Sequence, residues 1–128
     1  MAKSKATVLN QNKDFRTLYY RGKSQVGPCL VTYVRKNRLG VCRVGITTGK
    51  KIGKATARNR CRRLIREAYR LLRPSIEGSW DIVFVARTRT ANSSMQQVKK
   101  TMEAHFCALS LLPTTSLKRR NTDENASS

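Results

Sequence analysis

Apolar side chains recur at helical spacing through residues 56–73, and Pro74, which cannot continue a helix, follows directly. At about 100° per residue these positions fall on one side of a helix. They are Ala57, Cys61, Leu64, Ile65, Ala68, Leu71 and Leu72. The opposite side carries Asn59, Arg62, Arg63, Arg66, Arg70 and Arg73. The chain must therefore pack one side of this helix against a core and leave a cationic side open.

Shorter elements are predicted before this helix. Asn12 suits an N-cap and Gly22 suits the residue just after a helix end, so we expect a first helix between them. Residues 29–35 and 41–47 are rich in β-branched side chains and predict two strands. The short connection 36–40 between the two strands favours a β-hairpin.

Two further elements are predicted after the long helix. The apolar residues 82–86 indicate a buried strand. Ser93 and Gln96 have the spacing of a capping box and predict the start of a last helix, which Pro113 would end. The core stripe of that helix is Met95, Val98, Met102, Phe106 and Leu109.

The order of elements is helix, strand, strand, long helix, strand, helix, with room for a third strand before the long helix. This order predicts an α/β (α+β) two-layer sandwich, in which helices pack on a small mixed sheet. The apolar sides of the second and third helices would cover one sheet face and leave the other partly open for binding. We expect one domain over residues 1–113 and a disordered polar tail over residues 114–128.

The charge balance limits the partners of the chain. Its 128 residues include 27 Lys plus Arg and 7 Asp plus Glu, a formal net charge of +20. Self-repulsion on this scale disfavours a compact state, and a polyanion would relieve it. Nucleic acid is the commonest such partner, and an anionic membrane surface is the alternative. The longest apolar run, 82–86, is too short to span a bilayer and the N-terminus lacks a signal segment, so we expect a cytoplasmic protein.

The titratable residues form no recognisable catalytic or metal-binding pattern. The acids outside the tail are scattered, and His105 is the only histidine. No Cys-x-x-Cys pair is present, so we expect buried, reduced thiols. The cysteines are Cys29, Cys42, Cys61 and Cys107. Glu67 is interpreted as an ion-pair partner of basic residues on its own helix. We predict no catalytic residue, no metal site and no cofactor on the protein.

The basic segment 50–73 is the strongest indication of function. It holds ten Lys or Arg and a single acid, Glu67. A helix face that only meets water usually mixes both signs of charge. Arginine presents a planar fork that fits phosphate with two hydrogen bonds and packs on bases. The segment therefore predicts an RNA-binding surface.

The sequence of residues 50–67, KKIGKATARNRCRRLIRE, resembles the signature of the bacterial ribonuclease P protein family. In that family a Lys-Lys-x-Gly-x-Ala loop leads into an Arg-Asn-Arg helix that continues with further basic residues. The similarity extends to residues 14–16 (DFR), 43–46 (RVGI) and 80–83 (WDIV), and it covers residues 9–112.

The resemblance implies a subunit of a holoenzyme that removes the 5′ leader from precursor tRNA. It implies a large catalytic RNA, bound one to one, with Mg²⁺ at the RNA centre, and the protein assisting. It also implies a left-handed crossover through the Arg-rich helix. Neither DNA nor a membrane is an expected partner.

The resemblance also assigns roles to residues. Those expected to bind the catalytic RNA subunit are Lys50, Lys51, Lys54, Arg58, Asn59, Arg60, Arg62, Arg63 and Arg66. Phe15, Tyr19 and Tyr33 fall at the aromatic positions of a cleft that binds the single-stranded leader. Arg16 and Arg43 are nearby charges that we add on physical grounds, because cations beside stacking aromatics suit single-stranded RNA.

A structural RNA-binding protein of the ribosomal type is the alternative, since it shares the small size and basicity. The string 50–67 and the three aromatic residues favour the first interpretation, because scaffolding of ribosomal RNA would not require them. A basic protein on anionic membranes would need an apolar face outside the core, and none is predicted.

Overall fold

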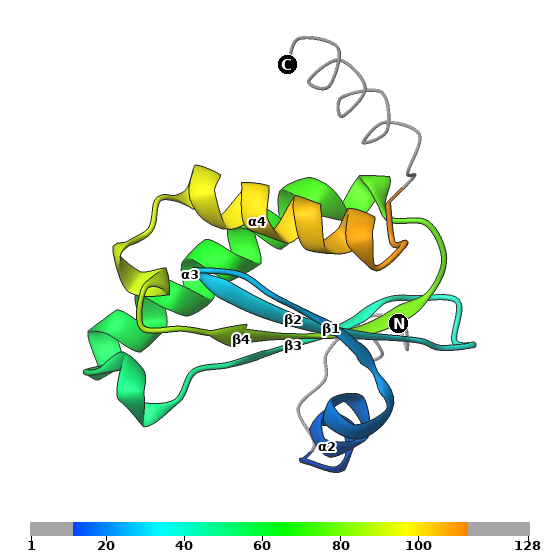
Figure 1. Ribbon diagram of the computed structural model, residues 1–128, viewed down its shortest axis with the longest axis horizontal. Coiled ribbons are helices and arrows are strands. Elements are labelled where there is room, and N and C mark those ends of the chain that lie inside the picture. Colours follow the sequence, from blue (N-terminus) through cyan, green and yellow to red (C-terminus); the bar gives the residue numbers. More distant parts are fainter. Residues whose placement is uncertain (1–11, 113–128) are drawn as a thin grey trace, which may run out of the picture.

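The computed structural model describes residues 12–112, which form a four-stranded mixed sheet with helices on both of its faces (Figure 1). The elements in chain order are α2 (Asn12–Arg21), β1 (Lys23–Val26), β2 (Leu30–Lys36), β3 (Arg43–Thr47), η1 (Lys50–Ile52), α3 (Ala55–Leu72), η2 (Arg73–Ser75), β4 (Trp80–Ala86), η3 (Thr90–Asn92) and α4 (Met95–Ala108). The predicted fold class is confirmed, and β1 is the third strand for which the sequence left room.

Strand β4 lies at the centre of the sheet, whose order is β1-β2-β4-β3. It pairs antiparallel with β2 from Leu30↔Ala86 to Lys36↔Trp80, and parallel with β3. The parallel pair β3 and β4 is connected through α3, as a crossover requires. The predicted hairpin between residues 29–35 and 41–47 is wrong, because β4 separates the two strands. Ile82, Val83 and Phe84 are completely buried. Because their side chains point to both faces of the sheet, this apolar strand is covered on both sides, as a central strand is.

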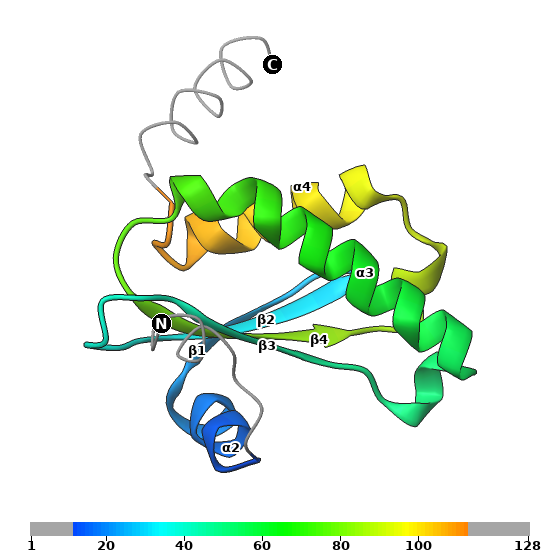
Figure 2. The same ribbon diagram turned by 180° about the vertical axis from the view of Figure 1, so that it is seen from behind.

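Helices α3 and α4 cover one face of the sheet and enclose the main core (Figures 1 and 2). The predicted stripe of α3 is confirmed at Cys61, Ile65, Ala68 and Leu72, which are buried. Leu71 is an exception, since 41% of it is exposed. The sequence missed Tyr69, whose ring lies edge-on to Phe84, with the centroids 5.9 Å apart. All four cysteines are buried and free, as predicted.

Helix α2 lies on the opposite face of the sheet and adds a partial third layer (Figure 1). Leu18 packs on Val83, and Phe15, Tyr33 and Val85 complete this second cluster. The helix leads directly into β1 at Gly22. A Cβ at this position would lie 2.6 Å from the Leu18 carbonyl oxygen and 2.8 Å from that of Val34, so only glycine allows this close approach.

Helix α4 begins one residue later than predicted. The capping box is formed by Ser94 and Gln97: the Gln97 amide donates to Ser94 Oγ and the Ser94 amide donates to Gln97 Oε1. The hydroxyl of Ser93 instead donates to the Arg89 carbonyl oxygen at 2.7 Å. In the predicted stripe Val98, Met102, Phe106 and Leu109 are buried.

The last residues of the domain follow α4 closely. The helix ends at Ala108, and Ser110 has a positive φ of 74°, so the chain turns before Pro113. Pro113, the boundary at residue 113 and the predicted disordered tail 114–128 lie outside the described residues. Within residues 12–112 no helix is both long and apolar enough to cross a membrane.

Candidate nucleic-acid interface

The sheet face that α3 and α4 leave uncovered carries a groove of about 700 Å³ beside α2. Because side chains alternate along a strand, Val31 and Tyr33 of β2 point to this face while Leu30, Thr32 and Val34 point into the core. The groove is lined by Val26, Val31, Tyr33, Gly49, Lys50, Lys51, Ile52, Val85, Ala86, Arg87 and Thr88. Its floor is apolar and its rim carries cations, a combination that suits stacked bases and their phosphates.

Two of the three predicted cleft aromatics form a pair at one side of this groove. The rings of Tyr19 and Tyr33 meet edge to face, with their centroids 4.8 Å apart. Tyr19 is 42% exposed, and Tyr33 is half-buried. Phe15 is also half-buried, but it packs against the Leu18–Val83 cluster. The structure thus brings the three side chains to one face of the sheet. Phe15 packs into the second hydrophobic cluster and keeps part of its surface exposed.

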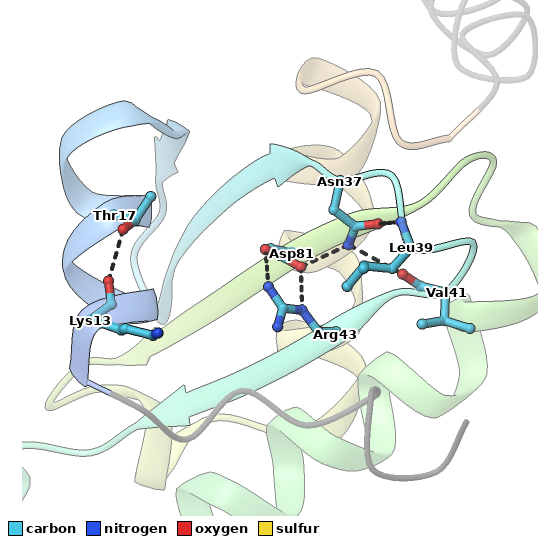
Figure 3. Close-up of polar contacts among 7 residues, drawn as sticks. All are labelled: Lys13, Thr17, Asn37, Leu39, Val41, Arg43 and Asp81. Carbon is cyan, nitrogen blue, oxygen red and sulfur yellow. Dashed lines mark hydrogen bonds and ion pairs between the residues drawn. The ribbon is translucent and has the colours of Figure 1, made fainter. Parts of the chain in front are cut away.

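Arg43 lies on the same sheet face and is held by Asp81 (Figure 3). Its Nε donates to Asp81 Oδ1 at 2.8 Å, and its Nη2 donates to Oδ2 at 2.7 Å. This hydrogen-bonded carboxylate raises the pKa of the Arg43 guanidinium. Asn37 Nδ2 donates to the same carboxylate at 2.7 Å and to the Val41 carbonyl oxygen at 3.2 Å. Arg43 therefore presents a largely compensated charge, and Asp81 ties the β2–β3 connection to β4.

The basic loop that leads into α3 borders the groove. Lys50 and Lys51 belong to η1 and contribute to the groove lining. Gly53 follows with a φ of 122°, a conformation that favours glycine, and Lys54 is the residue before α3. The turn at Gly53 thus connects the groove directly to the first turn of the Arg-rich helix.

The outer side of α3 is cationic, as predicted. Arg63, Arg66, Arg70 and Arg73 are exposed, whereas Arg58 and Arg62 are half-buried. Asn59 Oδ1 accepts a hydrogen bond from Arg62 Nη1 at 3.3 Å, which orients that guanidinium.

Further polar side chains of α3 have local partners. Glu67 pairs with Arg70 at 2.6 Å, as predicted, and this hydrogen bond lowers the pKa of the Glu67 carboxyl. Arg60 Nε donates to the Ala91 carbonyl oxygen at 2.6 Å. Arg60 therefore attaches α3 to η3, a structural role that the sequence did not indicate.

The predicted residues thus fall on two connected surfaces. Tyr33, Lys50 and Lys51 line the groove, with Tyr19 against Tyr33 outside the lining, and the Arg residues cover the outer side of α3. Arg16 is exposed on α2 and does not line the groove. The groove residues of β1 and of the segment after β4, such as Val26, Arg87 and Thr88, were not predicted from the sequence. The basic pair Arg87 and Arg89, directly after a buried strand, was the available signal.

Comparison with known proteins decides the family. The family model for ribonuclease P matches residues 4–110, most of the chain. The chain belongs to this family. It is similar to the ribonuclease P protein component of Clostridioides difficile (strain 630), with 44% identity over 96 residues that cover 74% of this chain and 84% of the relative.

Solved structures of the family share the fold. The RNase P protein of Staphylococcus aureus matches with a TM-score of 0.75 and 28% identity, over 84% of this chain and 99% of that chain. The RNase P protein of Thermotoga maritima matches with a TM-score of 0.67 and 30% identity, over 75% of this chain and 91% of that chain. The mixed sheet with its three helices is therefore the family fold.

Membership defines the role of the chain. It is the protein subunit of ribonuclease P, a ribonuclease that acts in 5′ processing of tRNA together with an RNA subunit. Neither the fold nor the relatives favours the alternative of a ribosomal-type structural protein. Among residues 12–112 no three His, Cys, Asp or Glu side chains are grouped so that they could hold a metal ion. His105 is buried and accordingly does not reach either surface.

Proposed function

We propose that the groove holds the single-stranded 5′ leader of precursor tRNA while the outer side of α3 binds the catalytic RNA. The protein would then align the leader with the RNA that cuts it. The observation that carries this proposal is the direct connection between the two surfaces, because Lys50 and Lys51 line the groove only a few residues before α3 begins.

The groove has the chemistry of a sequence-tolerant single-strand site. Tyr33 and Tyr19 offer aromatic faces or edges, and Val31 and Val85 provide an apolar floor. Lys50, with Lys51, supplies charge for the phosphates. Stacking on aromatic side chains accepts any base, and cations follow the backbone, so leaders of different sequence would fit. Arg16 and Arg43 would act from the neighbouring surface, Arg43 with a charge already compensated by Asp81.

The outer side of α3 has the chemistry of a phosphate-binding surface. Its Arg63 and Arg66 are exposed, and the only acid on α3, Glu67, is already paired with Arg70. The residues proposed to bind the catalytic RNA are Lys50, Lys51, Lys54, Arg58, Asn59, Arg60, Arg62, Arg63 and Arg66. Arg60 would do so while it also holds η3.

The catalytic centre would lie in the RNA subunit. Mg²⁺ bound by that RNA would supply the activation of water and the stabilisation of charge in phosphodiester hydrolysis. The protein contributes binding and orientation: each chain would serve one large RNA, in the cytoplasm and without DNA or a membrane. The scattered positions of the acidic residues and the absence of a ligand cluster in residues 12–112 support this division.

The test compares precursor tRNA with mature tRNA, which has no leader, on the reconstituted holoenzyme. Stacking on an aromatic residue is worth about 1–3 kcal/mol per base, or about 5- to 150-fold in affinity. Tyr33→Ala should therefore weaken binding of precursor tRNA by a factor in this range and leave mature tRNA nearly unchanged. Tyr33→Phe, which keeps the ring, should restore most of the affinity.

Tyr20 provides a matched control, since it is a tyrosine of the same region, 89% exposed and outside the groove lining. Tyr20→Ala should leave both affinities unchanged. Equal losses for precursor and mature tRNA in Tyr33→Ala, or equal effects of the two Ala variants, would contradict leader binding in the groove.

A further inference from the structure

A second cavity, of about 410 Å³, lies between the β1–β2 turn, η3 and the start of α4. It is lined by Pro28, Cys29, Arg89, Asn92, Ser93, Gln97, Lys100 and Thr101. Its volume is within the range of roughly 300–1,000 Å³ that is typical of sites for small ligands. None of the roles assigned above uses this cavity, which we call the η3 pocket.

The lining of the η3 pocket is mixed, with Pro28 and Cys29 as apolar members, and it carries positive charge. Arg89 and Lys100 bring two cations, and no carboxylate is among the lining residues. Asn92 brings a side-chain amide, and Gln97, whose Oε1 accepts from the Ser94 amide in the capping box, brings its Nε2 donor; both groups can pair with the edges of nucleobases. A site with this composition disfavours a metal cation and favours an anion with hydrogen-bonding groups, such as a nucleotide with its phosphate.

The wall that carries Arg89 is fixed by buried hydrogen bonds. Thr90 is completely buried; its hydroxyl donates to the Cys29 carbonyl oxygen at 2.6 Å and accepts from the Arg87 amide at 2.8 Å. Ser93, only 8% exposed, donates to the Arg89 carbonyl oxygen. The turn that presents Arg89 is therefore preorganised, and a ligand would not have to order it.

The η3 pocket and the groove that is proposed to hold the leader are lined by neighbouring residues of the same two segments, 26–29 and 85–89. Val26, Arg87 and Thr88 line the groove, whereas Pro28 and Arg89, which follow on the same two segments, line the pocket. A hydrogen bond of 2.9 Å from Arg87 Nη1 to the Gly27 carbonyl oxygen joins these two segments, and we call this junction the Gly27–Arg87 ridge. An RNA strand that leaves the groove at Thr88 would have to cross this junction to reach the pocket, which lies on the α4 side of the sheet.

We propose that the η3 pocket binds one nucleotide of the same RNA strand after it has crossed the Gly27–Arg87 ridge. Arg89 and Lys100 would hold its phosphate, and the amides of Asn92 and Gln97 would contact its base. This proposal rests on leader binding in the groove and extends it. The protein would then read a longer stretch of single strand than the groove alone can accept.

The experiment measures binding of labelled single-stranded oligoribonucleotides of about four and about nine nucleotides to the full chain, lengths within the usual range for single-strand sites. The affinity for the short oligonucleotide should be lowered by Tyr33→Ala and should not change when residues of the η3 pocket are replaced. The long strand should bind the Arg89→Ala/Lys100→Ala variant about five- to tenfold more weakly. The plot of log K against log salt should also become less steep, by about 0.7 for each phosphate that the variant no longer neutralises.

Lys99→Ala is the matched control, because Lys99 neighbours Lys100 on α4 but does not line the pocket. It should affect neither strand. A photo-reactive uridine at either end of the long strand should also crosslink to residues of the η3 pocket. An unchanged affinity of the long strand in the double variant, or an equal loss in Lys99→Ala, would overturn the proposal.

Two further outcomes separate the possible failures. If Tyr33→Ala fails to weaken the short strand, leader binding in the groove is wrong and the path into the pocket falls with it. If Tyr33→Ala weakens binding of the short oligonucleotide but the Arg89→Ala/Lys100→Ala variant binds the long one with unchanged affinity, only the pocket proposal fails. Titration with adenosine monophosphate tests a free nucleotide as ligand: binding abolished in the double variant while long strands are unaffected would overturn the RNA path.

Discussion

Arg43 and Asp81 face each other across the parallel strands β3 and β4, and two hydrogen bonds of 2.8 and 2.7 Å join the guanidinium to the carboxylate (Figure 3). The same carboxylate accepts from Asn37 Nδ2. This end of the open face therefore has a compensated charge. Within residues 12–112 no carboxylate pairs with Lys50 or Lys51, which line the groove beyond the other end of β3, where an RNA backbone would be attracted.

Removal of the Asp81 carboxylate should destabilise the protein. Asp81→Ala leaves Arg43 and Asn37 without their acceptor, and the two side chains of the pair are only 25% and 15% exposed. We expect a decrease of about 1–3 kcal/mol in the free energy of unfolding, measured with urea. Arg43→Ala should cost less, because Asn37 keeps its acceptor.

Glu67→Gln is the control for this prediction, since it removes a carboxylate from an exposed pair on α3 and should leave the unfolding transition unchanged. Equal stability of Asp81→Ala and the unmodified protein would show that the network in Figure 3 contributes nothing.

His105 predicts a dependence of stability on pH. The ring is 5% exposed, its Nδ1 lies 2.8 Å from Thr32 Oγ1, and burial lowers the pKa of the imidazole. The unfolded chain therefore takes up the proton more readily than the folded protein. The contribution of neutral His105 to the free energy of unfolding should be fully present above the ordinary histidine pKa of about 6.5. It should fall as the pH decreases below that value, by at most about 1.4 kcal/mol per pH unit.

Urea unfolding between about pH 7.5 and 5 measures this effect, in a window above the usual range of carboxylate titration. His105→Gln removes the titrating group and should flatten the profile, even if it lowers stability overall. A slope of the same size in the variant would assign the pH dependence to other groups.

The topology shows where local sequence signals are insufficient. Strands β2 and β3 are close in sequence, with turn residues between them, and a hairpin was the natural prediction. The decisive feature was the continuous apolar run 82–86: such a run indicates a strand buried on both faces, which belongs between others rather than at an edge. The capping box was displaced because Ser93–Gln96 and Ser94–Gln97 both satisfy the pattern. The buried bond of Ser93 to the Arg89 carbonyl selects the second.

The two surfaces differed in how far the sequence revealed them. The cationic side of α3 depends on one helix, so its helical spacing alone predicted it. The groove is built from β1, β2, β4 and η1, which are distant in sequence, and no local pattern contains it. The aromatic positions were accessible only through the family resemblance. The structural role of Arg60 could not be predicted either, because its hydrogen bond to the Ala91 carbonyl oxygen depends on where η3 lies.

The basic side of α3 should control the salt dependence of RNA binding. If Arg63 and Arg66 bind phosphates of the catalytic RNA, each of these side chains releases counterions. Arg63→Ala or Arg66→Ala should weaken binding of the RNA subunit and reduce the slope of log K against log salt by roughly 0.9 for each phosphate left without its arginine. Lys99→Ala, on α4 and outside this surface, is the control. An unchanged slope in both variants would mean that this side of the helix faces only water.

The proposed division of labour, with the catalytic centre in the RNA subunit, predicts that the protein alone does not cleave. The purified chain should leave precursor tRNA intact at any Mg²⁺ concentration, and addition of the cognate RNA should produce cleavage. Glu67→Gln and His105→Gln holoenzymes should keep a normal rate of the chemical step, measured in single turnover. Correct cleavage by RNA-free protein, shown to be clear of contaminating nuclease, would place catalytic groups in this chain.

Phe15 and Tyr19, four residues apart on α2, should separate packing from leader binding. Phe15 is half-buried against Leu18 and Val83, so Phe15→Ala should lower the free energy of unfolding by about 2–3 kcal/mol, below the range for a fully buried phenylalanine. Tyr19 is 42% exposed and meets Tyr33 edge to face, so Tyr19→Ala should cost less than about 1 kcal/mol. In holoenzyme assays Tyr19→Ala should still weaken binding of precursor tRNA relative to mature tRNA. If it instead melts early and binds both RNAs equally poorly, the aromatic pair is part of the core and the leader must bind elsewhere.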